Sequence, residues 1–336
     1  MSQKEEKQSS LWIGTAVSLA CIALILWLVD PQEVLEALRV AQYSYLALCA
    51  ALMVLFLALR AVRWRILLDN QVSWSQTFHI QNIGYMLGML LPFRLGDVAR
   101  AVLIGNVPPL TIGRGASTMV VERLLDLLFF VVLLPFTVAG LPTVPENIRT
   151  AALVSGIIAL FGIVVLVVAA NQRPLVLRLS AAVLGRTPLR QPERITHQVD
   201  ELLKGLNSLT QWGTGLRLLL WSVILWLPVL SAYYIVMRSV GLEVTPLTAA
   251  FITCVAAFSV AAPSSPGQIG VFHLAVTAAL TEILGQPEGP AVSFAILYHT
   301  TQFLLFILIG LIALPSTGTT FQQTIQSARQ WRQRNR

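Results

Sequence analysis

The feature that most constrains this chain is a series of long apolar segments without charged residues. Residues 11–29, 43–59, 151–170 and 218–237 contain neither acid nor base, and 290–314 carries only one histidine. A helix of about 20 apolar residues is long enough to cross the hydrocarbon core of a bilayer. Charged residues make up 12% of the 336 residues, about half the share that is usual in a soluble domain. The sequence therefore predicts an all-α, polytopic membrane helix bundle.

The positions of Lys and Arg predict how these helices are oriented. The chain has 23 Lys and Arg against 16 Asp and Glu, and the basic residues gather in 60–75, 171–217 and 315–336. The positive-inside rule places these segments in the cytoplasm, together with both termini, and the protein in the cell (inner) membrane. The excess of basic residues is then explained by orientation in the membrane, and no nucleic-acid partner is expected. Residues 171–215 are expected to form an amphipathic cytoplasmic loop.

Two further segments, at 74–110 and 246–285, are apolar but are interrupted in the middle by Pro and Gly. Each must begin and end on the same side of the membrane if the charge distribution is to hold. We therefore expect re-entrant helical hairpins at these two places. Full crossings are expected at 11–29, 43–67, 113–139, 148–170, 216–239 and 290–314.

The two interruptions share a sequence pattern, Pro-x-x-x-Gly-(Asp or Gln)-(Val or Ile), at 92–98 and 263–269. Each follows two crossings and precedes a third, and an odd number of crossings inverts the second half relative to the first. The sequence predicts a single transmembrane domain over 1–336, with inverted halves at 11–140 and 148–314. Paired broken helices at corresponding positions indicate the binding site of a transporter.

Four short motifs follow one another along the chain. They are Arg60-x-x-Arg63-Trp64, Leu91-Pro92-x-Arg94-x-Gly96-Asp97-x-x-Arg100, Val121-Glu122-Arg123-x-x-Asp126 and Pro266-Gly267-x-Ile269-Gly270-Val271-Phe272. In this order they resemble the transmembrane domain of the lysylphosphatidylglycerol synthase/flippase family, over about 11–315. The resemblance implies an inverted-repeat bundle that moves a lipid head group between leaflets, without the family's soluble synthase domain. Asp97 and His273 stand where Glu is more usual in the family, which leaves the head group open.

The first interruption carries charges that need a task or a partner, since a charge near the bilayer centre costs at least about 2.5–3.5 kcal/mol. Arg94, Asp97 and Arg100 lie beside the expected start of a half-helix, whose free N–H groups attract anions. Arginine binds phosphate through paired planar donors, so these residues predict contact with a phosphate group. The alternative is that one arginine only pairs with Asp97 and pins the hairpin.

Glu122, Arg123 and Asp126 fall near the middle of the 113–139 crossing. The two carboxylates share a helix face, and Arg123 can reach Asp126. Three roles stay open for the carboxylates: holding Arg94 and Arg100 in place, taking up a proton during transport, or neutralising charge inside the bundle.

Arg60 and Arg63 lie near the cytoplasmic end of the 43–67 crossing. Snorkelling of their side chains to the interface is the favoured interpretation, and capture of an anionic lipid head group is the functional alternative.

Polar residues of the second half complete the predicted substrate site. They are Ser264, Ser265, Gln268, His273, His299 and Gln302. His273 could gain a proton near neutral pH or contact a neighbouring helix, and the second interpretation is favoured. His299 and Gln302 share one face of the last crossing, where cavity lining and interhelical bonding are equally open.

The sequence as a whole predicts a lipid translocase that moves an anionic phospholipid or a polyprenyl-phosphate lipid by alternating access. No nucleophile–base set, metal spacing or phosphate-binding loop is found, so neither catalysis nor a cofactor is expected. Two alternatives remain: a membrane-embedded transferase or phosphatase that uses Asp97, Glu122 and Asp126, and a carrier of a small soluble anion. A homo-oligomer is left open.

Overall fold

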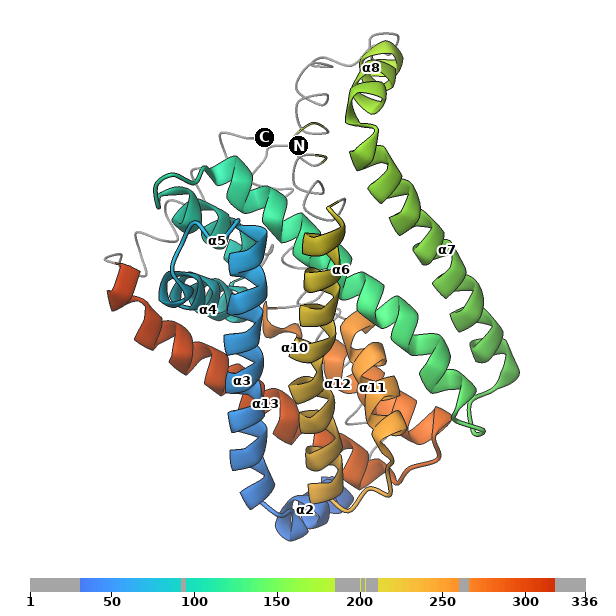
Figure 1. The fold of residues 1–336 in the computed structure, drawn as a ribbon. Coiled ribbons are helices and arrows are strands. Elements are labelled where there is room, and N and C mark those ends of the chain that lie inside the picture. The colour runs from blue at the N-terminus through green and yellow to red at the C-terminus, as the bar shows by residue number, and fades with distance from the viewer. Residues whose placement is uncertain are drawn as a thin grey trace, which may run out of the picture.

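The computed structural model describes residues 31–91, 95–184, 200, 203, 211–259 and 266–317. Every regular element within them is helical (Figure 1), so the all-α prediction is confirmed. The longer helices are α3 (Ser44–Leu67), α6 (Ile112–Ala139), α7 (Glu146–Asn171), α10 (Trp212–Ser239) and α13 (Glu288–Ala313). The shorter ones are α2 (Pro31–Val40), α4 (Trp74–Leu90), α5 (Leu95–Gly105), α8 (Arg173–Leu184), α11 (Pro246–Ser259) and α12 (Val271–Ala278), with short turns of other helix types at η1 (Pro266–Gln268), η2 (Ala279–Ile283) and η3 (Pro315–Thr317).

Four of the helices in the described part are long and apolar enough to cross a membrane. They are α3, α7, α10 and α13, and they match four of the six predicted crossings. The fifth, α6, is a helix of 28 residues with charged residues in its middle, which shortens its apolar length. The predicted crossing at 11–29 lies outside the described residues.

The outer surface of the bundle is apolar, as a lipid environment requires. Helix α7 runs along the edge of the molecule beside α6 (Figure 1), and most of its large side chains, such as Ile157 and Phe161, are exposed. Helix α8 follows it in the predicted amphipathic loop, most of which lies outside the described residues. Inside, α3 packs against α10, and α4 packs against α13.

The first interrupted segment forms two antiparallel helices, α4 and α5, on either side of residues 92–94. A hydrogen-bonded capping box between Ser73 and Gln76 starts α4. The two backbones then come very close, because a Cβ atom on Gly96 would overlap the carbonyl oxygen of Gly84. Gly84 also leaves room for the stem of Arg100, which a Cβ atom at this position would overlap. The predicted interruption is therefore present, while its re-entrant path through a membrane stays a prediction.

The second interrupted segment also contains two separate helices. Helix α11 ends at Ser259, and the chain resumes at η1 and α12. Gly267, Gln268 and Gly270 have φ angles of 71°, 60° and 90°. Glycine adopts such positive angles without the steric cost that a Cβ atom brings, so the two glycines allow the chain to turn sharply into α12.

The described flanks of the two interruptions lie against each other. A Cβ atom placed on Gly267 would be 3.3 Å from the carbonyl oxygen of Met89 and 3.0 Å from the ring of Phe303. Met89 is in the last turn of α4 and therefore borders the first interruption, whereas Phe303 lies on α13. The fold thus places Gly267, beside the second interruption, against the end of α4, as expected if the two interruptions share one site.

Candidate functional site: a buried arginine–carboxylate cluster

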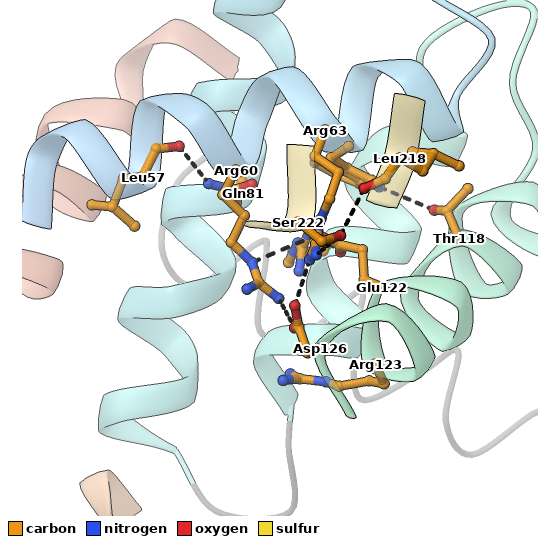
Figure 2. A network of polar contacts seen from close by, with 12 residues as sticks. Leu57, Arg60, Arg63, Gln81, Thr118, Glu122, Arg123, Asp126, Leu218 and Ser222 are labelled. Atoms are coloured by element: carbon orange, nitrogen blue, oxygen red, sulfur yellow. Dashed lines mark hydrogen bonds and ion pairs between the residues drawn. The ribbon is translucent and has the colours of Figure 1, made fainter. Parts of the chain in front are cut away.

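Five charged residues from three helices meet inside the bundle, and we call them the charged cluster. They are Arg60 and Arg63 on α3, Arg100 on α5, and Glu122 and Asp126 on α6. All five are between 0% and 8% exposed. Figure 2 shows Arg60 and Arg63 extending from α3 toward the carboxylates of α6.

Direct ion pairs hold the charged cluster together. Asp126 accepts one hydrogen bond from Nη2 of Arg60 and one from Nη2 of Arg63, each 2.7 Å long (Figure 2). Nη2 of Arg100 donates to Oε2 of Glu122, also at 2.7 Å. The other oxygen of Glu122 lies 3.6 Å from Nε of Arg60 and 3.8 Å from Nη2 of Arg63. Because both carboxylates bridge to arginines of other helices, the cluster ties α3, α5 and α6 together.

The charged cluster contains more positive than negative charge, and some of its N–H donors have no acceptor among the described residues. Three guanidinium groups face two carboxylates, which leaves one positive charge in excess. Within the described part of the chain, Nε of Arg60, of Arg63 and of Arg100 has no hydrogen-bond acceptor. Unpaired buried charge is expensive in a medium without water, so an anion that enters this region would be strongly favoured.

Aromatic rings lie close to two of the guanidinium groups that the carboxylates bind. The guanidinium of Arg100 lies 4.3 Å from the ring centroid of Trp64, and that of Arg60 lies 5.7 Å from Phe56. Tyr85 on α4 lies near both of these arginines, at 5.7 Å from Arg60 and 5.6 Å from Arg100. Such cation–π contacts stabilise a desolvated cation by about 2 kcal/mol.

Helix α10 joins the charged cluster through Ser222. Nη1 of Arg63 donates to the Ser222 hydroxyl at 3.0 Å, and that hydroxyl donates to the Leu218 carbonyl at 2.8 Å (Figure 2). The serine therefore satisfies one guanidinium nitrogen that neither carboxylate binds.

Replacing Ser222 with alanine is expected to lower the free energy of unfolding by about 1.5–3 kcal/mol, since a hydrogen bond to a charged group is lost. Ser239→Ala on the same helix is the control, because the equally buried Ser239 hydroxyl bonds only the carbonyl of Val236. Its loss should cost about 0.5–1.5 kcal/mol. Thermal unfolding in detergent compares the two variants. Equal losses would contradict a stabilising bond between Ser222 and Arg63.

The structure revises three sequence-based expectations about the arginine side chains. Arg60 and Arg63 do not snorkel, because α6 presents Asp126 to them inside the bundle. Arg123 bonds Asp97, at 3.1 and 3.2 Å, instead of Asp126, whose two oxygens already accept from the α3 arginines. Arg100 is bonded to Glu122, and the alternative in which Arg94 pairs with Asp97 lies outside the described residues. One of the three roles proposed for the α6 carboxylates, holding Arg100 in place, is thus present as a contact.

The second half contributes a histidine pair near Gly267. The rings of His273 and His299 are 4.9 Å apart and perpendicular, and His299 stacks on Phe272 at 5.0 Å. Nδ1 of His273 also accepts a 3.4 Å hydrogen bond from the backbone N–H of Gly270. The histidines therefore connect α12 with α13 at the second interruption.

The remaining predicted residues are distributed as follows. Gln268 and Gln302 are both half-buried, at η1 and on α13 respectively. Arg94, Ser264 and Ser265 lie outside the described residues. No group of three or more His, Cys, Asp or Glu within the described ranges is arranged to hold a metal ion, so the prediction of a metal-free protein stays a prediction.

Sequence reasoning assigned no role to three residues that contact the charged cluster. Trp64 was part of a motif without a function, and Ser222 and Tyr85 lie in apolar segments where one hydroxyl is unremarkable. Two polar groups that face each other from helices far apart in the sequence leave no periodic signal. Of the three residues, only Trp64 belongs to one of the four sequence motifs, in which it directly follows Arg63.

The helix bundle, its apolar surface and its buried charged cluster define a multi-pass membrane protein. The chain belongs to the family of the lysylphosphatidylglycerol synthase transmembrane region, whose profile matches residues 11–310. The resemblance predicted from the four motifs is confirmed.

Three curated relatives are similar over most of this chain. Glycosyltransferase AglD of Haloferax volcanii is 21% identical over 96% of the chain, which spans 56% of that protein's length. Two UPF0104 membrane proteins of Methanothermobacter thermautotrophicus are 24% and 20% identical. The alignments cover 88% and 92% of this chain and 89% and 96% of those proteins. No solved structure matches the chain.

Proposed function

We propose that this protein moves lipids with an anionic or phosphate-bearing head group between the leaflets of the cell (inner) membrane, in which both termini are cytoplasmic. The observation that carries the proposal is the buried excess of one positive charge over the carboxylates of α6. Membership of a family of lipid-related membrane proteins supports it. The lipid tails would stay in the bilayer while the head group passes through the interior of the bundle.

Charge exchange supplies a mechanism for this movement. The phosphate group of a lipid offers the same kind of oxygen acceptor that Glu122 and Asp126 offer to the arginines. When a phosphate binds a guanidinium group, the carboxylate that it replaces is released together with α6. The two predicted halves are in contact where Gly267 lies against Met89. We expect the movement of α6 to be transmitted through this contact, so that one half rocks against the other.

We further propose that the protein is not itself an enzyme. In this proposal Glu122 and Asp126 serve as exchange partners for the arginines that bind them, a role that needs neither a nucleophile nor a base. The relative named as a glycosyltransferase is matched over 56% of its length. Its name is a reason to include a polyprenyl-phosphate lipid, with and without a sugar, among the lipids tested.

The direct test uses purified protein in liposomes that contain a trace of fluorescent lipid. Dithionite bleaches the label in the outer leaflet, so the rate at which the inner label becomes accessible reports translocation. The labelled lipids would be phosphatidylglycerol, polyprenyl phosphate and, as an uncharged comparison, diacylglycerol. We expect accelerated movement of a phosphate-bearing lipid. Failure to accelerate any of them would contradict the proposed function, and uptake of free phosphate instead would favour the anion-carrier alternative.

Arg100→Lys is expected to slow translocation about tenfold or more, equivalent to about 1.4 kcal/mol. Lysine keeps the charge but loses the planar fork that matches phosphate oxygens. Arg114→Lys is the control, since Arg114 pairs with the exposed Asp69 away from the charged cluster. It should translocate at the wild-type rate. A folded Arg100→Lys protein that is as fast as the wild type would show that the cargo does not use this guanidinium.

A further inference from the structure

Tyr85 lies beside the charged cluster and contacts two of its arginines. Its ring lies near the guanidinium groups of both Arg60 and Arg100, at 5.7 and 5.6 Å, and contacts the ring of Phe306 at 5.4 Å. Phenylalanine would make the same three contacts, because all of them involve the ring. The packing around Tyr85 therefore gives no reason for a hydroxyl group.

The hydroxyl of Tyr85 is nevertheless buried, and it has no hydrogen-bond partner among the residues that the structure describes. A buried polar group without a partner costs about 1–3 kcal/mol. A cost of this size at a position where phenylalanine fits equally well indicates that the hydroxyl serves a ligand.

The charges around this hydroxyl favour an anion. The guanidinium groups of Arg60 and Arg100 lie 5.7 and 5.6 Å from the Tyr85 ring, and Arg123 also interacts electrostatically with this residue, as does one carboxylate, Glu122. Arg123 differs from the other two arginines because half of its side chain is exposed. Of the arginines that act on this hydroxyl, one can therefore be reached from outside and two cannot.

The donors around Tyr85 complete a binding site for oxygen atoms. Nε of Arg100 has no acceptor among the described residues, and Nε of Arg60 has only the distant Oε1 of Glu122, at 3.6 Å. Arg123 is bonded to Asp97 at distances of 3.1 and 3.2 Å, which is long for a charged pair, and Asp97 is itself 29% exposed. A phosphate oxygen could replace the Asp97 carboxylate without leaving that carboxylate buried and unpaired.

We propose that Tyr85 and Arg123 form the outer edge of a phosphate-binding site, in which the Tyr85 hydroxyl donates a hydrogen bond to a phosphate oxygen and Arg123 exchanges Asp97 for the phosphate. The inference rests on the proposed function and identifies the residues that first bind the head group. The phosphate then passes from Arg123, across Tyr85, to the buried arginines. A ligand without a phosphate oxygen gains nothing from this hydroxyl.

Tyr85→Phe tests the proposal, because it removes the hydroxyl and keeps the ring. Binding would be measured on detergent-purified protein as the rise in melting temperature with added short-chain phosphatidylglycerol, inorganic phosphate or short-chain diacylglycerol. We expect the apparent Kd for phosphatidylglycerol to rise about tenfold or more, as for the loss of a hydrogen bond to a charged group. The melting temperature without ligand should not fall, because no bond within the protein is lost.

Tyr233→Phe is the matched control. Tyr233 is also buried, but its ring lies 4.1 Å from that of Tyr298, among the aromatic side chains between α10 and α13. This variant should bind phosphatidylglycerol as the wild type does. Weaker binding in Tyr85→Phe alone would separate a ligand contact from the general effect of removing a buried hydroxyl.

The possible outcomes distinguish this inference from the proposed function. If the wild type translocates lipid but Tyr85→Phe equals it in binding and rate, the phosphate site at Tyr85 is wrong and the proposed function stands. If no lipid is translocated but phosphatidylglycerol binding is weakened in Tyr85→Phe, the site stands and the translocase proposal fails. Stabilisation by inorganic phosphate, lost in Tyr85→Phe, would assign a site for free phosphate, whereas stabilisation only by the lipid would assign a head-group site. Equal stabilisation of both proteins by diacylglycerol alone would overturn the inference.

Discussion

Replacing Asp126 with asparagine should lower the free energy of unfolding by about 3–5 kcal/mol, the usual cost of removing one partner from a buried ion pair. Asp126 accepts bonds from two arginines that are at most 3% exposed. Its neutralisation would leave the charged cluster with two positive charges in excess. Thermal unfolding in detergent and the yield of monodisperse protein would measure the loss.

Asp69→Asn provides the comparison. Asp69 also accepts a short bond from an arginine, Arg114, at 2.6 Å, but 57% of its side chain is exposed. An exposed pair of this kind contributes about 0–1 kcal/mol, so this variant should unfold close to the wild type. Similar small changes in both variants would show that the charged cluster is not assembled in the folded protein.

Gly96→Ala is expected to disrupt the α4–α5 hairpin. The new methyl group would overlap the carbonyl oxygen of Gly84 and approach the backbone nitrogen of Gly88 to 2.7 Å. A backbone cannot rotate away as a side chain can, so the helices must separate, at a cost of about 1–3 kcal/mol or more. Since Arg100 lies one turn further along α5, the same shift should pull it away from Glu122 and slow translocation more than tenfold, that is, by more than about 1.4 kcal/mol.

Gly88→Ala is the matched control in the same hairpin. A Cβ atom on Gly88 meets nothing within 4 Å, and alanine is favoured over glycine in a helix by about 1 kcal/mol. This variant should be as stable as the wild type or slightly more stable. Equal melting temperatures and rates for both alanine variants would be inconsistent with the close approach of α4 and α5.

The long helices could be predicted because their cause is local. A charge-free run such as that in α7 specifies both the helix and its environment without reference to the rest of the chain. The interruptions were predictable for the same reason, since Pro and Gly act on the backbone where they stand. The family resemblance rested on four motifs in order, which also requires only the linear sequence.

The partners inside the bundle could not be predicted, because they depend on how helices pack. Arg60 and Arg63 lie near the end of a crossing, where snorkelling is usual, and only the neighbouring position of α6 turns them inward. Arg123 and Asp126 have a spacing that permits a bond within one helix, yet Asp126 is taken by the arginines of α3. Tyr85 has no sequence signal, since the lack of a hydrogen-bond partner for its hydroxyl among the described residues is visible only when its surroundings are known.

The sharing of one carboxylate between two arginines restricts how this protein can evolve. A change at Asp126 alone removes the short ion pair of both Arg60 and Arg63, and loss of either arginine alone leaves one buried oxygen of Asp126 without its donor. Neutral drift at any of these three positions is therefore blocked unless a second change follows. Descendants of this chain should retain all three residues or exchange them as a set.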